Sequence, residues 1–228
     1  MNEVRRRLAG HAGVAAAGLA MIFGAAAWLH TPRGIAALRA AGVPCPVGQA
    51  SATDVAAVRE RGLAQLRGLP AAPSRAALGL AFDGTTLAQA QAWAARKGIA
   101  CDQVSKGLQF LRCRGVDAAA LGVQGPPVSE LWLSFGAAGR LVGVDLYRRG
   151  LDDGGAATAW SDASARLRSA LGAPLREVGD AAPAVLRASA LQTARIEYRY
   201  RDYLASVTAA NLPHAGLAVR EQYLSASR

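Results

Sequence analysis

Two cysteines with a suggestive spacing, Cys101 and Cys113, lie symmetrically about Gly107 in the segment IACDQVSKGLQFLRC. The residues on either side of Gly107 are typical of two short strands, and a loop over 106–108 would place the cysteines directly opposite each other. No CxxC pair or histidine cluster lies nearby, so neither a zinc site nor a redox motif is indicated. In an oxidising compartment this spacing predicts a disulfide across a hairpin.

The third cysteine, Cys45, lies between two prolines in the segment VPCPVGQ, which indicates a loop. It lacks the small-residue box that precedes a lipid-modified cysteine. It can be a free thiol, can bond to another chain, or can replace one of the other two cysteines in the bridge. The spacing leaves these alternatives open.

Side chains suited to acid–base or nucleophilic chemistry are sparse. Among three histidines only His214 lies in the body, in the turn-like segment NLPHAG, where a solvated histidine is ordinary. Asp152 and Asp153 precede a predicted helix, where carboxylates ordinarily complement the helix dipole, and Asp145 lies in a predicted strand. No nucleophile elbow, zinc-protease, P-loop or dinucleotide motif occurs. We therefore predict no catalytic residue, no metal ligand and no cofactor.

Charged and aromatic side chains alternate in the segment TARIEYRYRDYLAS. As a strand it would place Arg195, Glu197, Arg199 and Arg201 on one face, and Ile196, Tyr198 and Tyr200 on the other. Interleaved arginine and tyrosine can bind single-stranded nucleic acid, but this alternation separates them. The ordinary interpretation is a solvated basic face over a core that contains tyrosine. The functional interpretation is a docking face for a protein or an anionic polymer, made by Arg195, Arg199 and Arg201.

The compartment is indicated by the first thirty residues or so. The segment MNEVRRR precedes an uncharged run, residues 8–29, and a helix of that length would cover a hydrocarbon core of about 30 Å. The arginines before the run favour a cytoplasmic N-terminus. We predict a transmembrane anchor; a signal peptide cleaved near the small residues 25–27 and a buried core helix are the alternatives. Either of the first two would export the body.

The formal net charge is +10, and all but two of the 26 basic residues are arginine. Such a chain can bind anionic lipid, polymer or nucleic acid, and its charge does not choose among them. Export of the body argues against nucleic acid. The length of 228 residues allows one medium domain with attachments.

Three helices and several hairpins would position these residues. A helix from Ser51 or Thr53 to about Leu69 would bury Val55, Val58 and Leu66 and expose Arg59, Glu60 and Arg67. A second begins at a capping box, Thr86 with Gln89, and a third covers about 155–171. A hairpin over 129–148 would bury Leu131, Leu133 and Phe135 on one strand and Val142, Val144 and Leu146 on the other. A meander of three strands follows from about residue 194.

Helices beside consecutive hairpins predict an α+β class, with helices on one face of an antiparallel sheet. The order looks doubled, because LSFGAAGRLVGVDL and RIEYRYRDYLASVTA each follow a helix. This pattern resembles the β-lactamase-inhibitor-like fold and the small outer-membrane-assembly lipoproteins that share it. The resemblance implies two helix–sheet units and a non-enzymatic binding role. It transfers no site residue.

The predicted organisation is an anchor or signal at 1–30, a helical connector at 31–76 and an α+β extracytoplasmic domain at 77–228. The predicted location is the inner membrane, spanned once through residues 8–29, with the body in the periplasm. The predicted function is a non-enzymatic binding or scaffold protein of the cell envelope with an envelope protein as partner. The alternative is an envelope-polymer-processing enzyme or a small-ligand domain that uses Asp145, Asp152 and Asp153.

Overall fold

The computed structural model describes residue 28 and residues 31–40, 52–106, 108–189 and 192–227. The chain divides into two compact units, residues 1–50 and 51–228. In the first, helix α2 (Pro32–Ala40) begins where the Gly34 amide donates to Thr31 Oγ1 at 3.2 Å. Cys45 and the predicted membrane run, apart from Trp28, lie outside the described residues. Within the described ranges, no helix combines the length and the apolar character needed to cross a bilayer.

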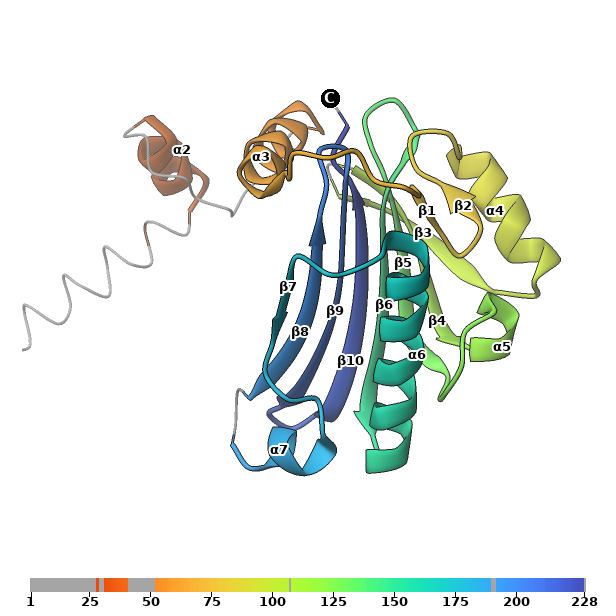
Figure 1. The fold of residues 1–228 in the computed structure, drawn as a ribbon. Coiled ribbons are helices and arrows are strands. Elements are labelled where there is room, and N and C mark those ends of the chain that lie inside the picture. Colours follow the sequence, from red (N-terminus) through yellow and green to blue (C-terminus); the bar gives the residue numbers. More distant parts are fainter. Residues whose placement is uncertain (1–27, 29–30, 41–51, 107, 190–191, 228) are drawn as a thin grey trace, which may run out of the picture. The chain divides into compact units, whose positions relative to one another are not determined.

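The second unit is built on one antiparallel sheet of eight strands in the order β3-β4-β5-β6-β10-β9-β8-β7 (Figure 1). Its strands are β3 (Cys101–Lys106), β4 (Leu108–Val116), β5 (Val128–Phe135), β6 (Leu141–Leu151), β7 (Arg176–Val178), β8 (Thr193–Arg199), β9 (Tyr203–Leu212) and β10 (Gly216–Ser225). A small separate ladder pairs β1 (Ala76–Ala77) with β2 (Leu80–Ala81). The predicted α+β class with an antiparallel sheet is confirmed, and the sheet is large.

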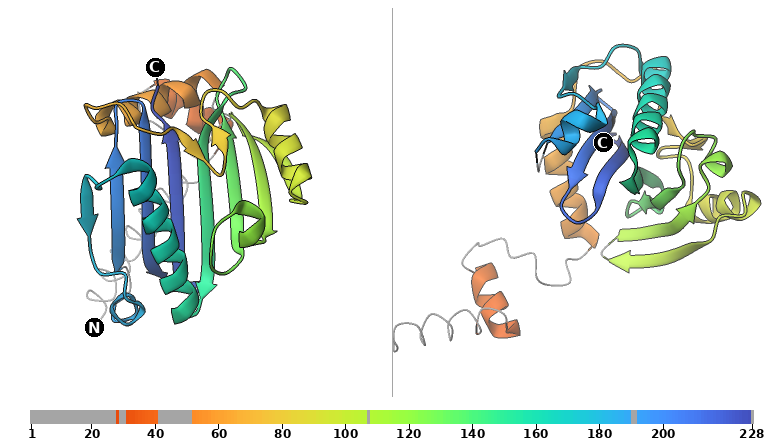
Figure 2. Two further views of the ribbon diagram at one scale, coloured as in Figure 1. Left: turned by 45° about the vertical axis from the view of Figure 1, so that its right-hand side comes forward. Right: turned by 90° about the horizontal axis from the view of Figure 1, so that it is seen from below.

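Helices lie on both faces of this sheet, but unequally. Four pack on the face that holds the main core: α4 (Leu87–Arg96), α5 (Ala118–Leu121), α6 (Asp153–Leu171) and α7 (Pro183–Arg187). Only α3 (Ala52–Leu66), among the described helices of this unit, lies on the opposite face, at one end of the sheet (Figure 2). The described helices of this unit therefore leave most of that second face uncovered.

Local sequence explains where the longer helices begin. Thr86 and Gln89 form the predicted capping box, with the Gln89 amide donating to Thr86 Oγ1 at 3.2 Å and the Thr86 amide to Gln89 Oε1 at 2.8 Å. Asp152 caps α6 by accepting from the Gly155 amide at 2.6 Å. This cap explains why α6 begins at Asp153, slightly before the predicted position.

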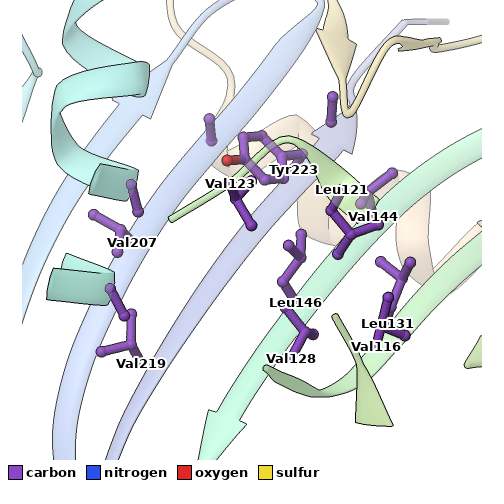
Figure 3. Packing of buried hydrophobic residues seen from close by; sticks show 14 of the residues in the cluster. Val116, Leu121, Val123, Val128, Leu131, Val144, Leu146, Val207, Val219 and Tyr223 are labelled. Carbon is purple, nitrogen blue, oxygen red and sulfur yellow. The ribbon is translucent and has the colours of Figure 1, made fainter. Parts of the chain in front are cut away.

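The main core follows the alternation of the central strands (Figure 3). Leu131, Leu133 and Phe135 are fully buried, as predicted. On β6 Val144 and Leu146 are fully buried, as predicted, and Leu141 is fully buried as well. The prediction for Val142 is wrong, since Val142 is only half-buried. The strand register shifts between Ser134 and Phe135, which breaks the alternation at this point.

Helix α3 presents a different face to the sheet from the one predicted. Leu63 is buried against Leu204 and Ala226, whereas Val58 is exposed. Arg59, predicted to face solvent, donates to the carbonyl oxygens of Val142 at 3.1 Å and Ser225 at 2.5 Å. The predicted buried face of α3 is wrong because it treats arginine as a solvent-facing residue. An arginine can pack its aliphatic stem along apolar surface while its guanidinium donates to carbonyl oxygens at the ends of strands.

Polar and charged side chains meet where α6 packs on the sheet, and we call them the buried charged cluster: Asp162, Arg166, Arg148, Glu221 and Tyr223. Arg148 and Glu221 have no exposed side-chain surface, whereas the Arg166 side chain is 31% exposed. Arg148 donates to Glu221 Oε1 at 2.9 Å, and Arg166 donates to Glu221 Oε2 at 2.8 Å. The Tyr223 hydroxyl donates to Glu221 Oε2 at 2.7 Å. Arg166 also pairs with Asp162 one helical turn away. The cluster fixes α6 to strands β6 and β10.

All five tyrosines have a raised pKa, and burial is the largest cause in each case: Tyr147, Tyr198, Tyr200, Tyr203 and Tyr223. The charge of Glu221 raises the Tyr223 pKa further. Tyrosines in the unfolded chain ionise at about pH 10, whereas those in the folded chain keep their protons to higher pH. The stabilisation that these tyrosines contribute is therefore fully present below about pH 10, and it is lost as the pH rises through their raised pKa values.

We expect the free energy of unfolding to fall steeply between about pH 10 and pH 12, and the fall to be less steep in Tyr203→Phe. Urea unfolding at a series of alkaline pH values would measure both slopes. Equal slopes in the two proteins would contradict the assignment to tyrosine ionisation.

Candidate docking surface

The face of the sheet opposite α6 is named here the open face. Strand register arranges its side chains in rows that cross the sheet from β4 to β8. One row reads Arg114, Glu130, Tyr147, Arg220, Thr208 and Arg195. The next reads Arg112, Trp132, Asp145, Gln222, Ser206 and Glu197. Arginines, carboxylates and aromatic rings thus share one continuous surface.

Two aromatic rings on this face are stacked by arginines. The guanidinium of Arg112 lies 4.9 Å from the Trp132 ring centroid. Tyr147 is contacted by two guanidiniums, that of Arg220 at 4.9 Å and that of Arg149 at 5.2 Å from its ring centroid. Each stack holds an arginine in place through cation–π attraction. The open face is therefore organised before any partner binds.

The carboxylates between these rings are occupied by arginines. Glu130 accepts from Arg112 at 2.5 Å and from Trp132 Nε1 at 2.8 Å. Partial burial acts to raise the pKa of the Glu130 carboxyl, but the bonds from Arg112 and Trp132 outweigh it, and the pKa is lowered. Glu130 therefore stabilises the fold at neutral pH, and this contribution is lost as the pH falls through its lowered pKa.

Asp145 shows the opposite balance. Burial raises the pKa of its carboxyl more than Arg220 and Gln222 lower it. Arg220 Nε and Gln222 Nε2 each donate to Asp145 Oδ1 at 3.0 Å. The folded chain favours the protonated form of Asp145. Its contribution to the free energy of unfolding is therefore largest below its ordinary pKa, and it declines as the pH rises through the raised pKa.

Two of the three predicted docking arginines lie together. Arg195 and Arg199 flank Glu197 on β8 and donate to its Oε1 at 3.4 and 3.0 Å. Ile196 and Tyr198 point into the core, as the alternation predicted. Arg201 lies beyond the strand, because β8 ends at Arg199 and a turn follows.

The aromatic half of the open face was not predicted as a site. Trp132 alternates with Leu131 and Leu133, so it lies on the face opposite the core, but its neighbours on β6 and β10 depend on pairing between distant segments. Tyr147 and Arg220 are directly opposed across β6 and β10, although 73 residues separate them. A tryptophan in the outward series of a strand is the sequence signal that could have pointed to this surface.

The cysteine prediction is confirmed, since Cys101 and Cys113 are disulfide-bonded. They are directly opposed across β3 and β4, with Lys106 opposite Leu108 at the hairpin end. The bridge joins an edge strand to its neighbour, so it stabilises the end of the sheet that supports the Arg112 side of the open face.

The three carboxylates of the alternative function are not brought together. Asp145 lies on the open face, whereas Asp152 caps α6 and Asp153 pairs with Arg187 at 2.8 Å on the helical side. His214 is exposed in the turn between β9 and β10. Across the described residues there is no group of three or more histidine, cysteine or acidic side chains placed to hold a metal ion.

Comparison with known proteins adds no relative: no family model, no curated protein and no solved structure matches this chain.

Proposed function

We propose that this protein is a membrane-anchored, non-enzymatic binding protein of the cell envelope, which docks an acidic surface of a partner protein on its open face. The observation that carries the proposal is the composition of that face. Tryptophan, tyrosine and arginine are the residues most enriched at binding hot spots. Here they lie side by side, and among the helices that the structure describes in residues 51–228 none covers most of their area.

Charge selects the kind of partner. The most exposed arginine side chains on the open face are Arg114, Arg149 and Arg195, with 54, 45 and 45% exposure. The carboxylates beside them are each paired with arginine. A partner that brings carboxylates would meet guanidiniums that are already held in place, Arg114 and Arg195 by ion pairs and Arg149 by stacking on Tyr147. This supports specific recognition of an acidic surface.

The proposed location rests on the sequence. Residues 8–29 would form the anchor, with the arginine-rich N-terminus in the cytoplasm and the body in the periplasm. The disulfide supports export, because such bonds persist in oxidising compartments. An alkaline phosphatase fused to the C-terminus of the full chain should be active, and activity of a cytosolic reporter alone at that position would contradict this location.

The body also supports the two-unit interpretation. Helix α4 precedes the meander β3–β6, and α6 precedes the meander β7–β10. The two meanders meet through their last strands, β6 and β10. We propose that these are the two helix–sheet units implied by the resemblance, joined so that the open face runs across both.

The test of function is photo-crosslinking in intact cells, with the crosslinker placed in the full chain at Thr208 on the open face or at Ala165 on the exposed side of α6. We expect a saturable crosslink to one protein from Thr208 and none from Ala165. The combined variant Arg114→Glu, Arg149→Glu and Arg195→Glu should lower that crosslink by about tenfold or more, because like charges across an interface cost several kcal/mol.

A matched variant makes the same charge change on the helical side: Arg96→Glu, Arg168→Glu and Arg187→Glu. It should leave the crosslink unchanged. Equal loss in both variants would indicate a non-specific charge effect, and no loss in either would remove the open face as the docking surface.

A further inference from the structure

Strand β3 lies at one edge of the eight-stranded sheet and pairs with β4 alone. The register of this pair runs from Cys101 to Lys106 without a shift, and the strand contains neither proline nor glycine. Strand β7, at the opposite edge, is only three residues long. Edge strands commonly avoid further pairing through a bulge, a proline or shortness, and β3 has none of these features.

The disulfide shows which backbone groups of β3 point away from the sheet. Opposed residues in an antiparallel pair alternate between hydrogen-bonded pairs, with Cα atoms about 5.5 Å apart, and non-hydrogen-bonded pairs, at about 4.5 Å. The Cα atoms of Cys101 and Cys113 are 4.1 Å apart, so these residues form a non-hydrogen-bonded pair. The backbone groups of Gln103 and Ser105, two and four positions further on, therefore point outward like those of Cys101.

The outward backbone groups are open to a further strand. Gln103 and Ser105 are both exposed. Among the residues that the structure describes, none forms a hydrogen bond with the outward amide and carbonyl groups of these two residues. Gln91 of α4 reaches β3 through its side chain, with Nε2 donating to Gln103 Oε1 at 3.2 Å. An extended polypeptide can therefore add to this edge through its backbone.

The charges on β3 restrict which strand can add. Charged side chains on an edge strand ordinarily oppose pairing. Strand β3 carries Asp102 and Lys106 with Val104 midway between them. An antiparallel strand fits this pattern when it also carries an acid, an apolar residue and a base in that order, because each charge then lies opposite its counter-charge. Strand β3 of a second copy has this order.

We propose that two copies of this chain pair antiparallel through β3, with a two-fold axis at Val104. In this register Gln103 of each copy lies opposite Ser105 of the other, so their outward backbone groups face each other and form hydrogen-bonded pairs. Val104 lies opposite Val104 of the second copy, and Asp102 lies opposite Lys106 of the second copy. These are non-hydrogen-bonded pairs, in which side chains approach most closely.

A second copy requires less ordering than a flexible segment of another protein. The disulfide and the unbroken register hold β3 extended before the copies meet. A flexible segment would lose its backbone freedom on pairing, which lowers its affinity. The contact is confined to a strand of six residues, so we expect a reversible dimer that depends on concentration.

The two-fold axis of such a dimer is perpendicular to the sheet, so the sheet continues through both copies and both open faces lie on the same side. The dimer itself does not depend on the proposed function. Its consequence for binding does rest on that function: two docking surfaces side by side can engage a partner at two points, which raises the overall affinity.

The test is sedimentation of the full chain in detergent over a range of concentrations. The unaltered chain should pass from monomer to dimer as its concentration rises. Asp102→Lys alone and Lys106→Asp alone should each raise the dissociation constant of the dimer by about tenfold or more, because each places like charges opposite each other twice across the axis. An equimolar mixture of the two variants should dimerise like the unaltered chain, because opposite charges face each other again in the mixed dimer.

The matched control is Glu177→Lys, which makes the same change of charge on the other edge strand, at a side chain that is 51% exposed. It should leave the dissociation constant unchanged. Asp102 also pairs with Arg114 at 2.9 Å, but both side chains are more than half exposed. Loss of that pair should therefore have little effect on folding.

A photo-crosslinker at Ser105 locates the contact. It should give a product of twice the chain mass, and the same group at Ala165 on α6 should give none. Absence of a dimer of the unaltered chain, a dimer that survives both single variants, or a mixture no better than its components would overturn the proposal. A crosslink from Ser105 to a different protein would show that another strand occupies this edge, and the proposal would be wrong.

Failure of this proposal can be distinguished from failure of the proposed function. A saturable crosslink from Thr208 to a partner, without any dimer, would remove the pairing through β3 and leave the proposed function standing. A dimer that responds to the charge variants, without a crosslink from Thr208, would support the pairing and remove the proposed function.

Discussion

Replacement of Glu221 by glutamine is expected to lower the free energy of unfolding by about 3–5 kcal/mol. Glu221 and Arg148 both have no exposed side-chain surface, and they are paired at 2.9 Å. Removal of the carboxylate charge leaves the Arg148 guanidinium buried without its counter-charge, and Arg166 loses its second carboxylate partner. Urea unfolding of the full chain at neutral pH would measure the change.

The control for this prediction is Glu177→Gln. Glu177 also pairs with an arginine, Arg168 at 2.8 Å, but the two side chains are 51 and 44% exposed. A solvated pair contributes little, so the control should change the free energy of unfolding by about 1 kcal/mol or less. A Glu221→Gln variant no less stable than this control would contradict the role given to the buried charged cluster.

Loss of the disulfide is expected to lower the free energy of unfolding by about 3 kcal/mol, which is the chain-entropy value for a loop of this length. The bridge joins residues separated by 12 positions, Cys101 and Cys113. The double variant Cys101→Ser and Cys113→Ser should show the change in urea unfolding. A reducing agent should have a similar effect on the unaltered chain.

Cys45→Ser provides the control for the bridge, because Cys101 and Cys113 pair with each other. It should unfold at the same urea concentration as the unaltered chain, and it should remain sensitive to reductant. A chain whose unfolding does not respond to reductant would contradict a stabilising disulfide.

Features set by near neighbours in the chain could be predicted from the sequence. Cys101 and Cys113 are opposed across one short hairpin, so the strand alternation and the glycine between them were sufficient to predict their pairing. The capping box at Thr86 is likewise decided within one helical turn. The alternation in β5 predicted its buried face because one side of the strand meets the core.

Features that depend on pairing between distant strands could not be predicted. Arg148 was not identified as a core residue, because its burial depends on Glu221 from β10 and on Arg166 from α6. The aromatic half of the open face depends on the same pairing of β6 with β10. The sequence shows each strand's alternation, but it does not show which strands become neighbours.

The contacts of α3 have a mechanical consequence. Arg59 of α3 donates to the carbonyl of Ser225, the last residue of β10, and Arg67, just after α3, donates to that of Ala226, so the end of this helix is fastened to the end of β10. Strand β10 has β6 on one side and β9 on the other, well inside the sheet. Tension applied to the chain ahead of α3 would thus act on an interior strand. To move, β10 would have to break its hydrogen bonds to β6 and to β9 together, whereas an edge strand could separate from its single neighbour one hydrogen bond at a time.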